Sequence, residues 1–330
     1  MKGQLRELVA KFGWRMPLQR LLSPRATVVL TYHGIPRHST RGIVNAEVFE
    51  QQMHFLKKNF QLISVDELDR GQRRRSEPVR VLLTFDDGFR NNAEVAAPIL
   101  RKFRIPAVFF VCSGHSGAGR YLWFVYLRAL ERWWPFNELR FAGQTLDMSR
   151  EKRAATVAWL RQELLKLRPH PSAMYKAIDQ EGPSLEEFVP VPELRNTCAG
   201  MTAEDVAALA CDPLFTIGIH TVDHPRLPLC EKQELLGQIV GNKIWIETLT
   251  RRPCDLIAYP EAEYNAEVVA QAAALGIRHG FVVGPRTVTC PHLQFPRVGI
   301  YSDSIDELGF KVRWGQLLNR VPVRARLFSN

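Results

Sequence analysis

The chain has 330 residues, of which 46% are hydrophobic and 24% are charged, a composition that is ordinary for a soluble globular protein. No apolar run approaches the ~20 residues that a membrane-spanning helix needs, and the six cysteines include no C-x-x-C pair, which argues against a zinc knuckle or a redox dithiol. The net charge of +10 comes from residues 1–25 and 311–330, whereas the body between them is neutral, so a nucleic-acid-binding face is not indicated.

The N-terminal segment, residues 1–25, has the pattern of a basic amphipathic helix. It contains six Lys or Arg and one Glu, and its apolar residues recur at helical spacing. Such a helix either packs on the body of the protein or contacts an anionic membrane surface, and the sequence leaves both interpretations open. Because Glu7, Lys11 and Arg15 interrupt any apolar core of a secretion signal, we expect a cytoplasmic location. Peripheral contact with the inner face of the membrane is the alternative.

Strand-like and helix-like stretches alternate along the body of the chain. The predicted strands are 28–32, 79–85, 107–111, 214–219, 256–259, 280–283 and 295–300. The predicted helices are 46–59, 92–103, 203–210, 232–249 and 266–275, with one short turn at 66–70. This alternation predicts an α/β fold with a parallel sheet, either open or closed into a barrel.

Residues 113–200 interrupt this alternation. Their pattern predicts a Gly-rich loop, a helix over 122–133, a second loop, a helix over 150–166 and a Pro-rich connection. The stretch is too long for a loop between a strand and a helix. We therefore interpret it as a helical insertion that covers one rim of the sheet.

The C-terminal segment, residues 311–330, is a second basic amphipathic stretch. Trp314, Leu317 and Leu318 share one helical face, and Lys311 and Arg313 lie elsewhere on the helix. The same two interpretations apply: a helix packed on the body with its charges solvated, or contact with an anionic membrane surface.

Two adjacent carboxylates follow the predicted strand at 79–85. Asp86 and Asp87 come directly after the apolar run, and Gly88 then turns the chain. Parallel sheets and barrels place their active sites at the C-terminal ends of the strands. Since neighbouring aspartates project differently, one can ligate a metal while the other stays free as a base, although a plain surface turn has the same composition.

Two histidines follow another predicted strand in the same way. His220 and His224 are four residues apart after the strand at 214–219, and they can meet one ion if the chain curls into a helical turn. Two histidines alone are more often structural than ligands. Because they recur at the same architectural position as Asp86 and Asp87, a shared metal site becomes the better interpretation.

These motifs together resemble those of the NodB-homology polysaccharide deacetylases, carbohydrate esterase family 4. The runs TFDDG at 84–88 and HTVDHP at 220–225 are similar to the first two motifs of the family. Residues 105–111 resemble the strand after the first motif, 257–260 resemble the third motif, and 30–34 resemble the start of a bacterial branch. The resemblance implies a distorted (β/α) barrel, here over residues 26–310 with the insertion at 113–200, that hydrolyses the acetamide of an N-acetylated sugar.

The resemblance implies roles for the four motif residues. Asp86 would be the general base, and Asp87, His220 and His224 would hold one divalent ion. An Asp-His-His set fits zinc, with cobalt, nickel or ferrous iron as alternatives. The ion would polarise the acetamide carbonyl and activate its bound water, and Asp86 would take a proton as that water attacks.

The third motif departs from the family pattern. The family has an arginine there that pairs with the base, and a tyrosine whose backbone N–H meets the oxyanion, whereas this sequence has Ala258 and Glu261 in those positions. A backbone donor survives any side chain, so Tyr259, Pro260 and Glu261 are candidates for binding substrate and oxyanion. The acid at Glu261 either reads a cationic or hydroxyl-rich substrate or faces solvent.

No late Leu-x-x-His motif supplies the general acid that the family uses. His33, after the strand at 28–32, is the candidate for this role, because imidazole titrates close to neutral pH. Arg297, in the strand at 295–300, is the candidate for replacing the positive charge missing at Ala258 and for keeping Asp86 ionised. The alternatives are a buried His33 bonded to a backbone carbonyl, and a surface Arg297.

The sequence therefore predicts removal of the acetyl group from an N-acetylhexosamine in a glycan, an oligosaccharide or a lipid-linked precursor. One alternative is removal of a formyl or another small acyl group from a sugar. A second is a degenerate, weakly catalytic relative that only binds sugar, against which the intact set of Asp86, Asp87, His220 and His224 argues.

Overall fold

The structure is a computed structural model that describes residues 24–38, 44–71, 74, 76–167, 170–283 and 290–318. Nearly all of the predicted helix at 1–25, and the part of the segment 311–330 that follows residue 318, lie outside these residues. Contact of these ends with a membrane surface therefore stays a prediction. Among the described helices, none is both long and apolar enough to cross a membrane.

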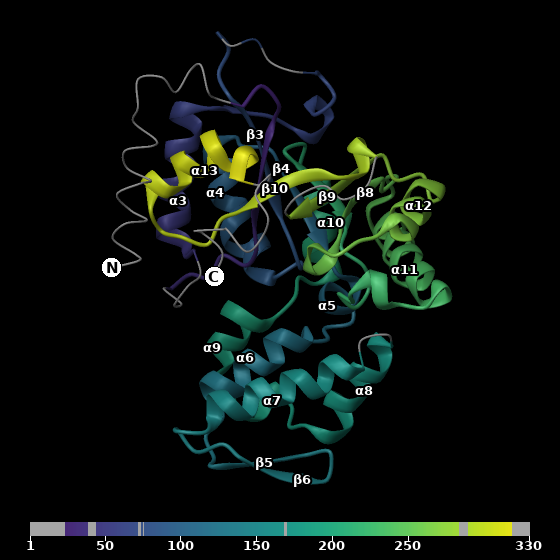
Figure 1. Cartoon of the computed structure of the whole chain (residues 1–330). Helices are drawn as coiled ribbons and strands as arrows, with labels where there is room; N and C mark the ends of the chain where they lie inside the picture. Colours follow the sequence, from purple (N-terminus) through teal and green to yellow (C-terminus); the bar gives the residue numbers. More distant parts are fainter. Residues whose placement is uncertain are drawn as a thin grey trace.

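Seven parallel strands form a closed barrel at the centre of the fold (Figure 1). Their order is β1, β10, β9, β8, β7, β4 and β3, and pairing of β3 with β1 closes the ring. The seven are β1 (Val28–Tyr32), β3 (Arg80–Phe85), β4 (Ala107–Val111), β7 (Phe215–Ile219), β8 (Leu256–Ala258), β9 (His279–Val283) and β10 (Phe295–Gly299). A short strand, β2 (Gln61–Leu62), pairs with the start of β3. The predicted (β/α) barrel is confirmed, and each predicted strand agrees with an observed one to within one residue at either end.

Alternate residues of each strand face two different apolar cores. Val29, Leu82 and Val108 belong to a small cluster that fills the barrel, while their neighbours along the strands pack outward. Thr84 and Asp86 continue the inward-facing set that begins at Leu82. Strand periodicity therefore directs the carboxylate of Asp86 into the mouth of the barrel.

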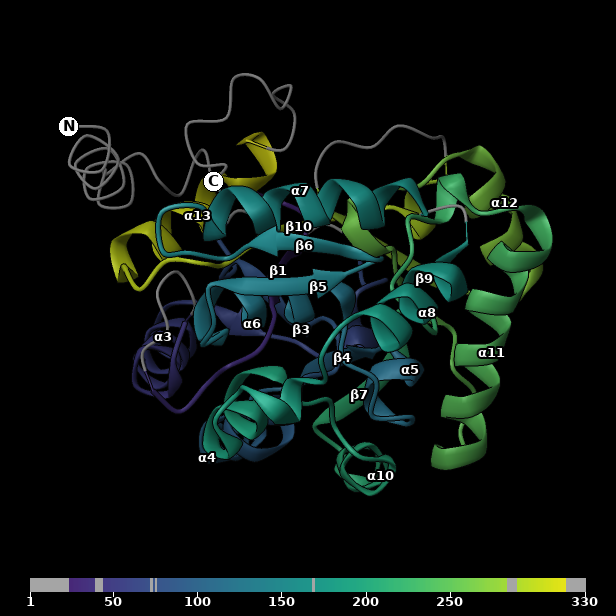
Figure 2. The ribbon, with the colours of Figure 1, turned by 90° about the horizontal axis from the view of Figure 1, so that it is seen from below.

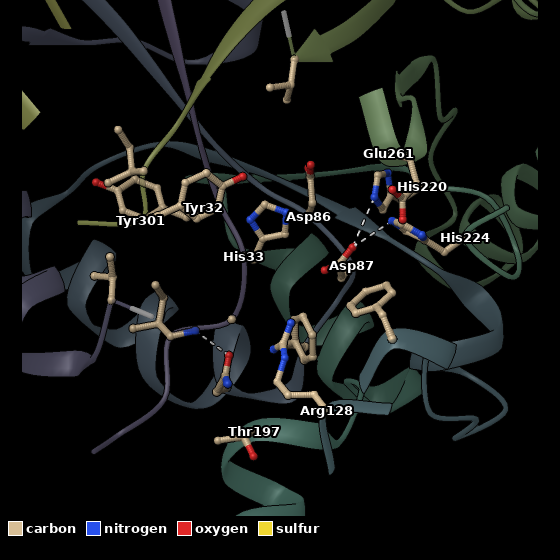
Figure 3. A pocket seen from close by; sticks show the side chains of 18 of the residues that line it. Tyr32, His33, Asp86, Asp87, Arg128, Thr197, His220, His224, Glu261 and Tyr301 are labelled. Carbon is tan, nitrogen blue, oxygen red and sulfur yellow. Dashed lines mark hydrogen bonds and ion pairs between the residues drawn. The ribbon is translucent and has the colours of Figure 1, made fainter. Parts of the chain in front are cut away.

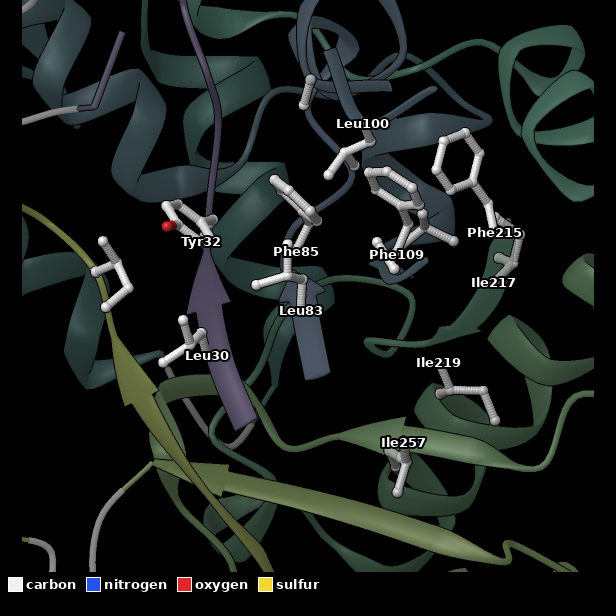
Figure 4. Packing of buried hydrophobic residues seen from close by; sticks show 14 of the residues in the cluster. Leu30, Tyr32, Leu83, Phe85, Leu100, Phe109, Phe215, Ile217, Ile219 and Ile257 are labelled. Carbon is white, nitrogen blue, oxygen red and sulfur yellow. The ribbon is translucent and has the colours of Figure 1, made fainter. Parts of the chain in front are cut away.

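The outward-facing residues pack under a layer of helices. Leu83, Phe85 and Phe109 lie in this larger core, where the rings of Phe85 and Phe109 stack with centroids 4.8 Å apart (Figure 4). The covering helices are α3 (Ala46–Asn59), the π-turn η2 (Asn92–Ala96) continued by α4 (Ala97–Phe103), α10 (Ala203–Cys211), α11 (Lys232–Thr250), α12 (Ala266–Ala274) and α13 (Ile305–Leu318). Single turns complete the domain at η1 (Val65–Glu67), η5 (Leu227–Leu229), η6 (Pro260–Ala262) and η7 (Pro291–Leu293).

The chain between β4 and α10 forms the insertion, which has an apolar core of its own. It contains α5 (Ser113–Ser116), α6 (Trp123–Trp133), β5 (Glu138–Phe141), β6 (Gln144–Asp147), α7 (Arg153–Lys166), α8 (Pro171–Glu181), η3 (Leu185–Glu187), α9 (Val191–Glu193) and η4 (Leu194–Cys198). Figure 1 shows it below the barrel, and in the view from below in Figure 2 its elements overlie the barrel strands.

Two elements of the insertion differ from the sequence prediction. The stretch at 138–147, predicted as loop, is an antiparallel hairpin whose turn residues Ala142 and Gly143 have φ of 49° and 73°. Such turns favour Asn-Gly or Asp-Gly, so the alanine hides the usual signal. The segment from Pro171, predicted as part of a Pro-rich connection, is a helix with proline in its first turn, where the missing N–H costs nothing.

The C-terminal helix also differs from its prediction. Helix α13 begins at Ile305 rather than near 311, and Lys311 is buried instead of solvated. The ammonium of Lys311 donates to the Gly299 carbonyl at 2.9 Å and lies 3.0 Å from Glu307. This lysine therefore anchors the helix against the end of β10.

Candidate active site

A cavity of about 540 Å³ lies at the C-terminal ends of the barrel strands (Figure 3). Of the nine residues predicted to form the site, all but Pro260 line it: His33, Asp86, Asp87, His220, His224, Tyr259, Glu261 and Arg297. The insertion adds part of the wall through Phe124, Arg128, Arg161 and Thr197. The strands and the insertion thus build one site together.

Asp86 forms a buried, bidentate ion pair with Arg297. Its Oδ1 accepts a hydrogen bond from Nη1 at 2.6 Å, and its Oδ2 accepts one from Nη2 at 2.7 Å. The same Nη1 donates to the hydroxyls of Thr31 and Thr84, both at 3.2 Å. Burial alone would raise the pKa of Asp86, but Arg297, helped by His220, outweighs burial and holds that pKa below its ordinary value. The carboxylate is therefore ionised at neutral pH.

Asp87, His220 and His224 form a buried cluster with their ligand atoms within 4.8 Å of one another. The Nε2 atoms of His220 and His224 each lie 3.4 Å from Oδ1 of Asp87, an oxygen without a hydrogen-bond partner of good geometry among the described residues. The Nδ1 of His220 bonds to the Ala258 carbonyl at 2.8 Å, which aims Nε2 at the cluster. One carboxylate and two imidazoles fit a zinc-type ion with positions left open for other ligands.

Charge in this cluster favours a cation at its centre. Burial lowers the pKa of His224 to about 4, so this imidazole is neutral, the form that ligates a metal. Burial would also lower the pKa of His220, but Asp86 and Asp87 outweigh burial and raise it. The two carboxylates thus stabilise a positive charge beside them, either a proton on His220 or a metal ion.

The backbone of both motifs adopts an unusual conformation. Asp87, Thr221 and His224 have φ of 75°, 71° and 55°, in the left-handed region that residues with side chains rarely enter. Such residues cost ~1–3 kcal/mol each and cluster at functional sites. The turn after Asp86 takes Asp87 out of the strand alternation, and the Thr221 hydroxyl accepts a hydrogen bond from the His224 N–H at 3.0 Å, which holds the second turn.

A polar network ties the loop of the second motif to helix α11 and to the insertion. Gln238 of α11 accepts hydrogen bonds from the N–H groups of Val222 and Asp223 at 3.1 and 2.8 Å, and its Nε2 donates to Asp223 at 2.9 Å. From the insertion, Arg120 pairs with the Asp223 carboxylate, and the Tyr175 hydroxyl donates to the Asp223 carbonyl at 3.1 Å. Asp223 therefore connects three parts of the fold next to His224.

We expect Gln238→Leu to lower the free energy of unfolding by ~2–4 kcal/mol. The substitution keeps the volume of the side chain but leaves the buried N–H of Asp223 without its acceptor and Oδ2 of Asp223 without its donor, at ~1–3 kcal/mol for each buried polar group. The N–H of Val222 keeps the backbone carbonyl of residue 238 as an acceptor at 3.2 Å. Gln233→Leu, the same change at an exposed position of α11, is the control and should stay within ~0.5 kcal/mol. Urea unfolding measures both variants, and equal stabilities would contradict a structural role for the network.

A family model described as polysaccharide deacetylase matches residues 73–163 and 173–280, which is more than half of the chain. The chain belongs to the polysaccharide deacetylase family. The family resemblance predicted from the motifs is therefore confirmed. Membership supports a hydrolase that removes acetyl groups from a carbohydrate. The cavity agrees with this activity, because Asp86, Asp87, His220 and His224 of the first two motifs all line it.

Solved structures of deacetylases share the fold. The Streptococcus pyogenes deacetylase PplD in complex with acetate is 19% identical, with a TM-score of 0.54 over 87% of this chain and 97% of that chain. IcaB from Ammonifex degensii is 17% identical, with a TM-score of 0.54 over the same shares. The putative polysaccharide deacetylase BA0330 from Bacillus anthracis is 18% identical, with a TM-score of 0.53 over 88% of this chain and 70% of that chain. Among curated proteins, none matches the sequence significantly.

Of the three residues predicted from the third motif to bind the oxyanion, one has a backbone donor available. The N–H of Tyr259 donates to the Phe281 carbonyl at 3.2 Å within the sheet, and Pro260 has no N–H, so neither can serve as predicted. Glu261, at φ 55°, provides the remaining N–H, and its side chain is exposed at the cavity wall. The buried ring of Tyr259 still lines the cavity, where it stacks on Tyr264 with centroids 5.4 Å apart.

His33 lies on the cavity wall opposite the third motif, next to Asp86 in Figure 3. Its ring is 5.7 Å from the ring of Tyr301, and its Nδ1 is buried without a hydrogen-bond partner among the described residues. The alternative of a backbone carbonyl that holds the imidazole is therefore not seen at Nδ1, and the role of His33 as the general acid stays a prediction.

Several residues of the site were not predictable from local patterns. Phe124 of α6 packs against His224 with ring centroids 5.2 Å apart, and Arg128 and Arg161 face the cavity from the same insertion. Phe124 and Arg128 lie in an ordinary amphipathic helix, and Arg161 lies in a helix with little amphipathic pattern. The packing of the insertion on the barrel brings them to the cavity.

Proposed function

We propose that the chain is a metal-dependent N-deacetylase that acts on an N-acetylhexosamine in a glycan, an oligosaccharide or a lipid-linked precursor. The observation that carries this proposal is the meeting of a buried Asp-His-His cluster with an ionised, arginine-paired aspartate in one cavity. Zinc is the ion that this ligand set favours, with cobalt, nickel or ferrous iron as alternatives. Family membership supports an acetylated carbohydrate as the substrate.

Asp87, His220 and His224 would hold the ion, which when bound supplies a Lewis acid for the acetamide carbonyl and a water of lowered pKa. Asp86 accepts the proton of the attacking water, a role that its ionised state and its fixed orientation on Arg297 support. Arg297 keeps this carboxylate ionised and aimed into the barrel mouth. The N–H of Glu261 donates to the oxyanion as it forms.

The leaving amine needs a proton, and His33 is the residue that supplies it. Its ring lies on the cavity wall with a buried nitrogen that no described residue engages. Collapse of the tetrahedral intermediate breaks the C–N bond, and the proton moves from the imidazole to the amine nitrogen, so that acetate and a free amino sugar leave.

The test is release of acid from zinc-loaded protein incubated with N-acetylated and N-formylated chitooligosaccharides. We expect acetate from the first series at a rate above that of formate from the second. Preference for formate would instead identify a deformylase. Binding of sugar with release of neither acid would identify the degenerate relative, and the deacetylase proposal would then be wrong.

Arg297→Gln is expected to move the acidic limb of the kcat/KM profile to higher pH by ~1–3 units, the size of shift that a neighbouring opposite charge produces. The pKa of Asp86 is held down by Arg297, so removing the charge raises it, and the base becomes protonated at a pH where the wild-type base is ionised. Arg297→Lys is the control, because it keeps the charge but not the two parallel hydrogen bonds, and its shift should be smaller. An acidic limb that stays in place in the Gln variant would remove Arg297 from this role.

His33→Ala is expected to slow kcat by at least ~10²-fold while the metal content stays at the wild-type level. The loss follows because the amine would have to leave without a positioned proton donor. His54→Ala, at an exposed position of α3 outside the cavity, is the control. Near-normal kcat in His33→Ala would show that another residue or water protonates the leaving group.

A further inference from the structure

Two arginines of the insertion face the cavity across from the barrel strands. Arg128 belongs to α6 and Arg161 to α7, two helices that pack together within the insertion. Figure 3 shows Arg128 reaching from its helix toward the side of the cavity where Asp87 lies. Both side chains are exposed, so their guanidinium groups are open to a molecule that enters the cavity.

Within the described residues, neither Arg128 nor Arg161 forms an ion pair or a side-chain hydrogen bond. Other arginines near the site are paired, such as Arg120 with Asp223 and Arg226 with Glu263. Arg161 instead lies over the ring of Trp123 at 5.3 Å, a contact that holds a guanidinium while leaving its N–H groups available. Among the described residues, no carboxylate therefore forms a salt bridge with either of the two cavity arginines, although Glu261 interacts with Arg161 at longer range.

With a divalent ion bound, the charges around the cavity would leave a positive surplus, because three arginines alone balance the three carboxylates of Asp86, Asp87 and Glu261. Arg297 neutralises Asp86, and a divalent ion would more than neutralise Asp87. Glu261 is the remaining carboxylate of the cavity wall, and its single negative charge offsets one of the two positive charges of Arg128 and Arg161. A cavity of about 540 Å³ lies within the ~300–1,000 Å³ range of ligand sites, so a bound sugar can carry a further group toward the insertion.

We propose that Arg128 and Arg161 bind an anionic group, a phosphate or a carboxylate, carried by the acetylated sugar or by the unit joined to it. The proposal rests on the deacetylase function proposed above and narrows its substrate to anionic carbohydrates. Guanidinium groups suit this task because their planar N–H forks match the oxygens of phosphate and carboxylate. The insertion then selects the substrate while the barrel provides the reacting groups.

The experiment compares kcat/KM on three small substrates: N-acetylglucosamine 1-phosphate, N-acetylmuramic acid and neutral methyl N-acetylglucosaminide. The proteins are zinc-loaded wild type, the double variant Arg128→Gln/Arg161→Gln, and Arg132→Gln. Arg132 is an exposed arginine of the same helix that lies over Trp133 and outside the cavity, so it controls for the loss of charge. The phosphate and the carboxylate substrates distinguish the two sources of the anion.

We expect wild type to prefer at least one anionic sugar over the neutral one. The double variant should lose ~10²-fold on that sugar, about tenfold for each charged hydrogen-bonding group, and less than about threefold on the neutral sugar. Arg132→Gln should match wild type on all three. Equal losses on anionic and neutral sugars, or no preference in wild type, would overturn the role of the arginines while acetate release still supports the deacetylase.

If zinc-loaded wild type releases acetate from none of the sugars, calorimetric binding of the same probes decides the inference separately. Binding of an anionic sugar that is at least ~10-fold tighter in wild type than in the double variant supports an anion site. Equal affinities of wild type and the double variant for the anionic sugars would overturn the anion site, whether or not the protein is a deacetylase.

Discussion

His220→Ala and His224→Ala should each lower the affinity for a divalent ion by more than the ~10–100-fold that loss of a second-shell partner costs. Three protein ligands would hold the ion, and the open positions of a catalytic site offer no spare one. The ring of His220 is also oriented by the Ala258 carbonyl, an arrangement that the alanine variant removes together with the ligand atom. Activity should fall in step with metal content.

Metal analysis after dialysis measures this loss, and thermal unfolding checks that each variant still folds. His54→Ala, an exposed histidine of α3, should keep the wild-type metal content. One ion per chain retained by the double variant His220→Ala/His224→Ala would show that the cluster is not the metal site.

Asp86→Asn should keep the ion and lower kcat by ~10²–10⁴-fold, the range that general base catalysis supplies. The amide cannot accept the proton of the attacking water, although its oxygen can still accept a hydrogen bond from Arg297. Because the variant leaves a buried guanidinium without its counter-charge, the protein should also be less stable.

Asp87→Asn is the matched variant at the neighbouring position, with the same change of charge and size. It should lose the ion, because a neutral amide oxygen replaces the anionic ligand between the two imidazoles. If Asp86→Asn loses the ion while Asp87→Asn keeps it, the roles assigned to the two aspartates are reversed.

The barrel and its first two motifs could be predicted because their signals are local. Each strand is a short apolar run, and Asp86 and His220 stand directly after such runs, where parallel strands place functional groups. The alternation of the strand fixes the direction of Asp86. The turn that redirects Asp87 depends on positive φ values at Asp87 and Gly88. Glycine is the usual signal of a positive φ, but an aspartate is not, so the conformation of Asp87 could not be predicted from its residue type.

The partner of Asp86 depends on the order of strands in the barrel. Arg297 stands opposite Val29 because β10 pairs with β1, a neighbour more than 260 residues away in the chain. A position near the end of a strand was enough to suggest Arg297, but the two hydrogen bonds to Asp86 depend on the closed barrel. The same holds for the insertion, whose hairpin and helix α8 lack clear local signals and whose arginines reach the cavity only through tertiary packing.

The measurement that tests the central claim most directly is a zinc titration of metal-stripped protein, followed by acetate release from an N-acetylated sugar at each step. Stripped protein should release no acetate, and the rate should rise with added zinc to a plateau at one ion per chain. Acetate release that is independent of the ion, or a stoichiometrically loaded protein that releases none from neutral or anionic N-acetylated sugars, would contradict a metal-dependent deacetylase built on Asp87, His220 and His224.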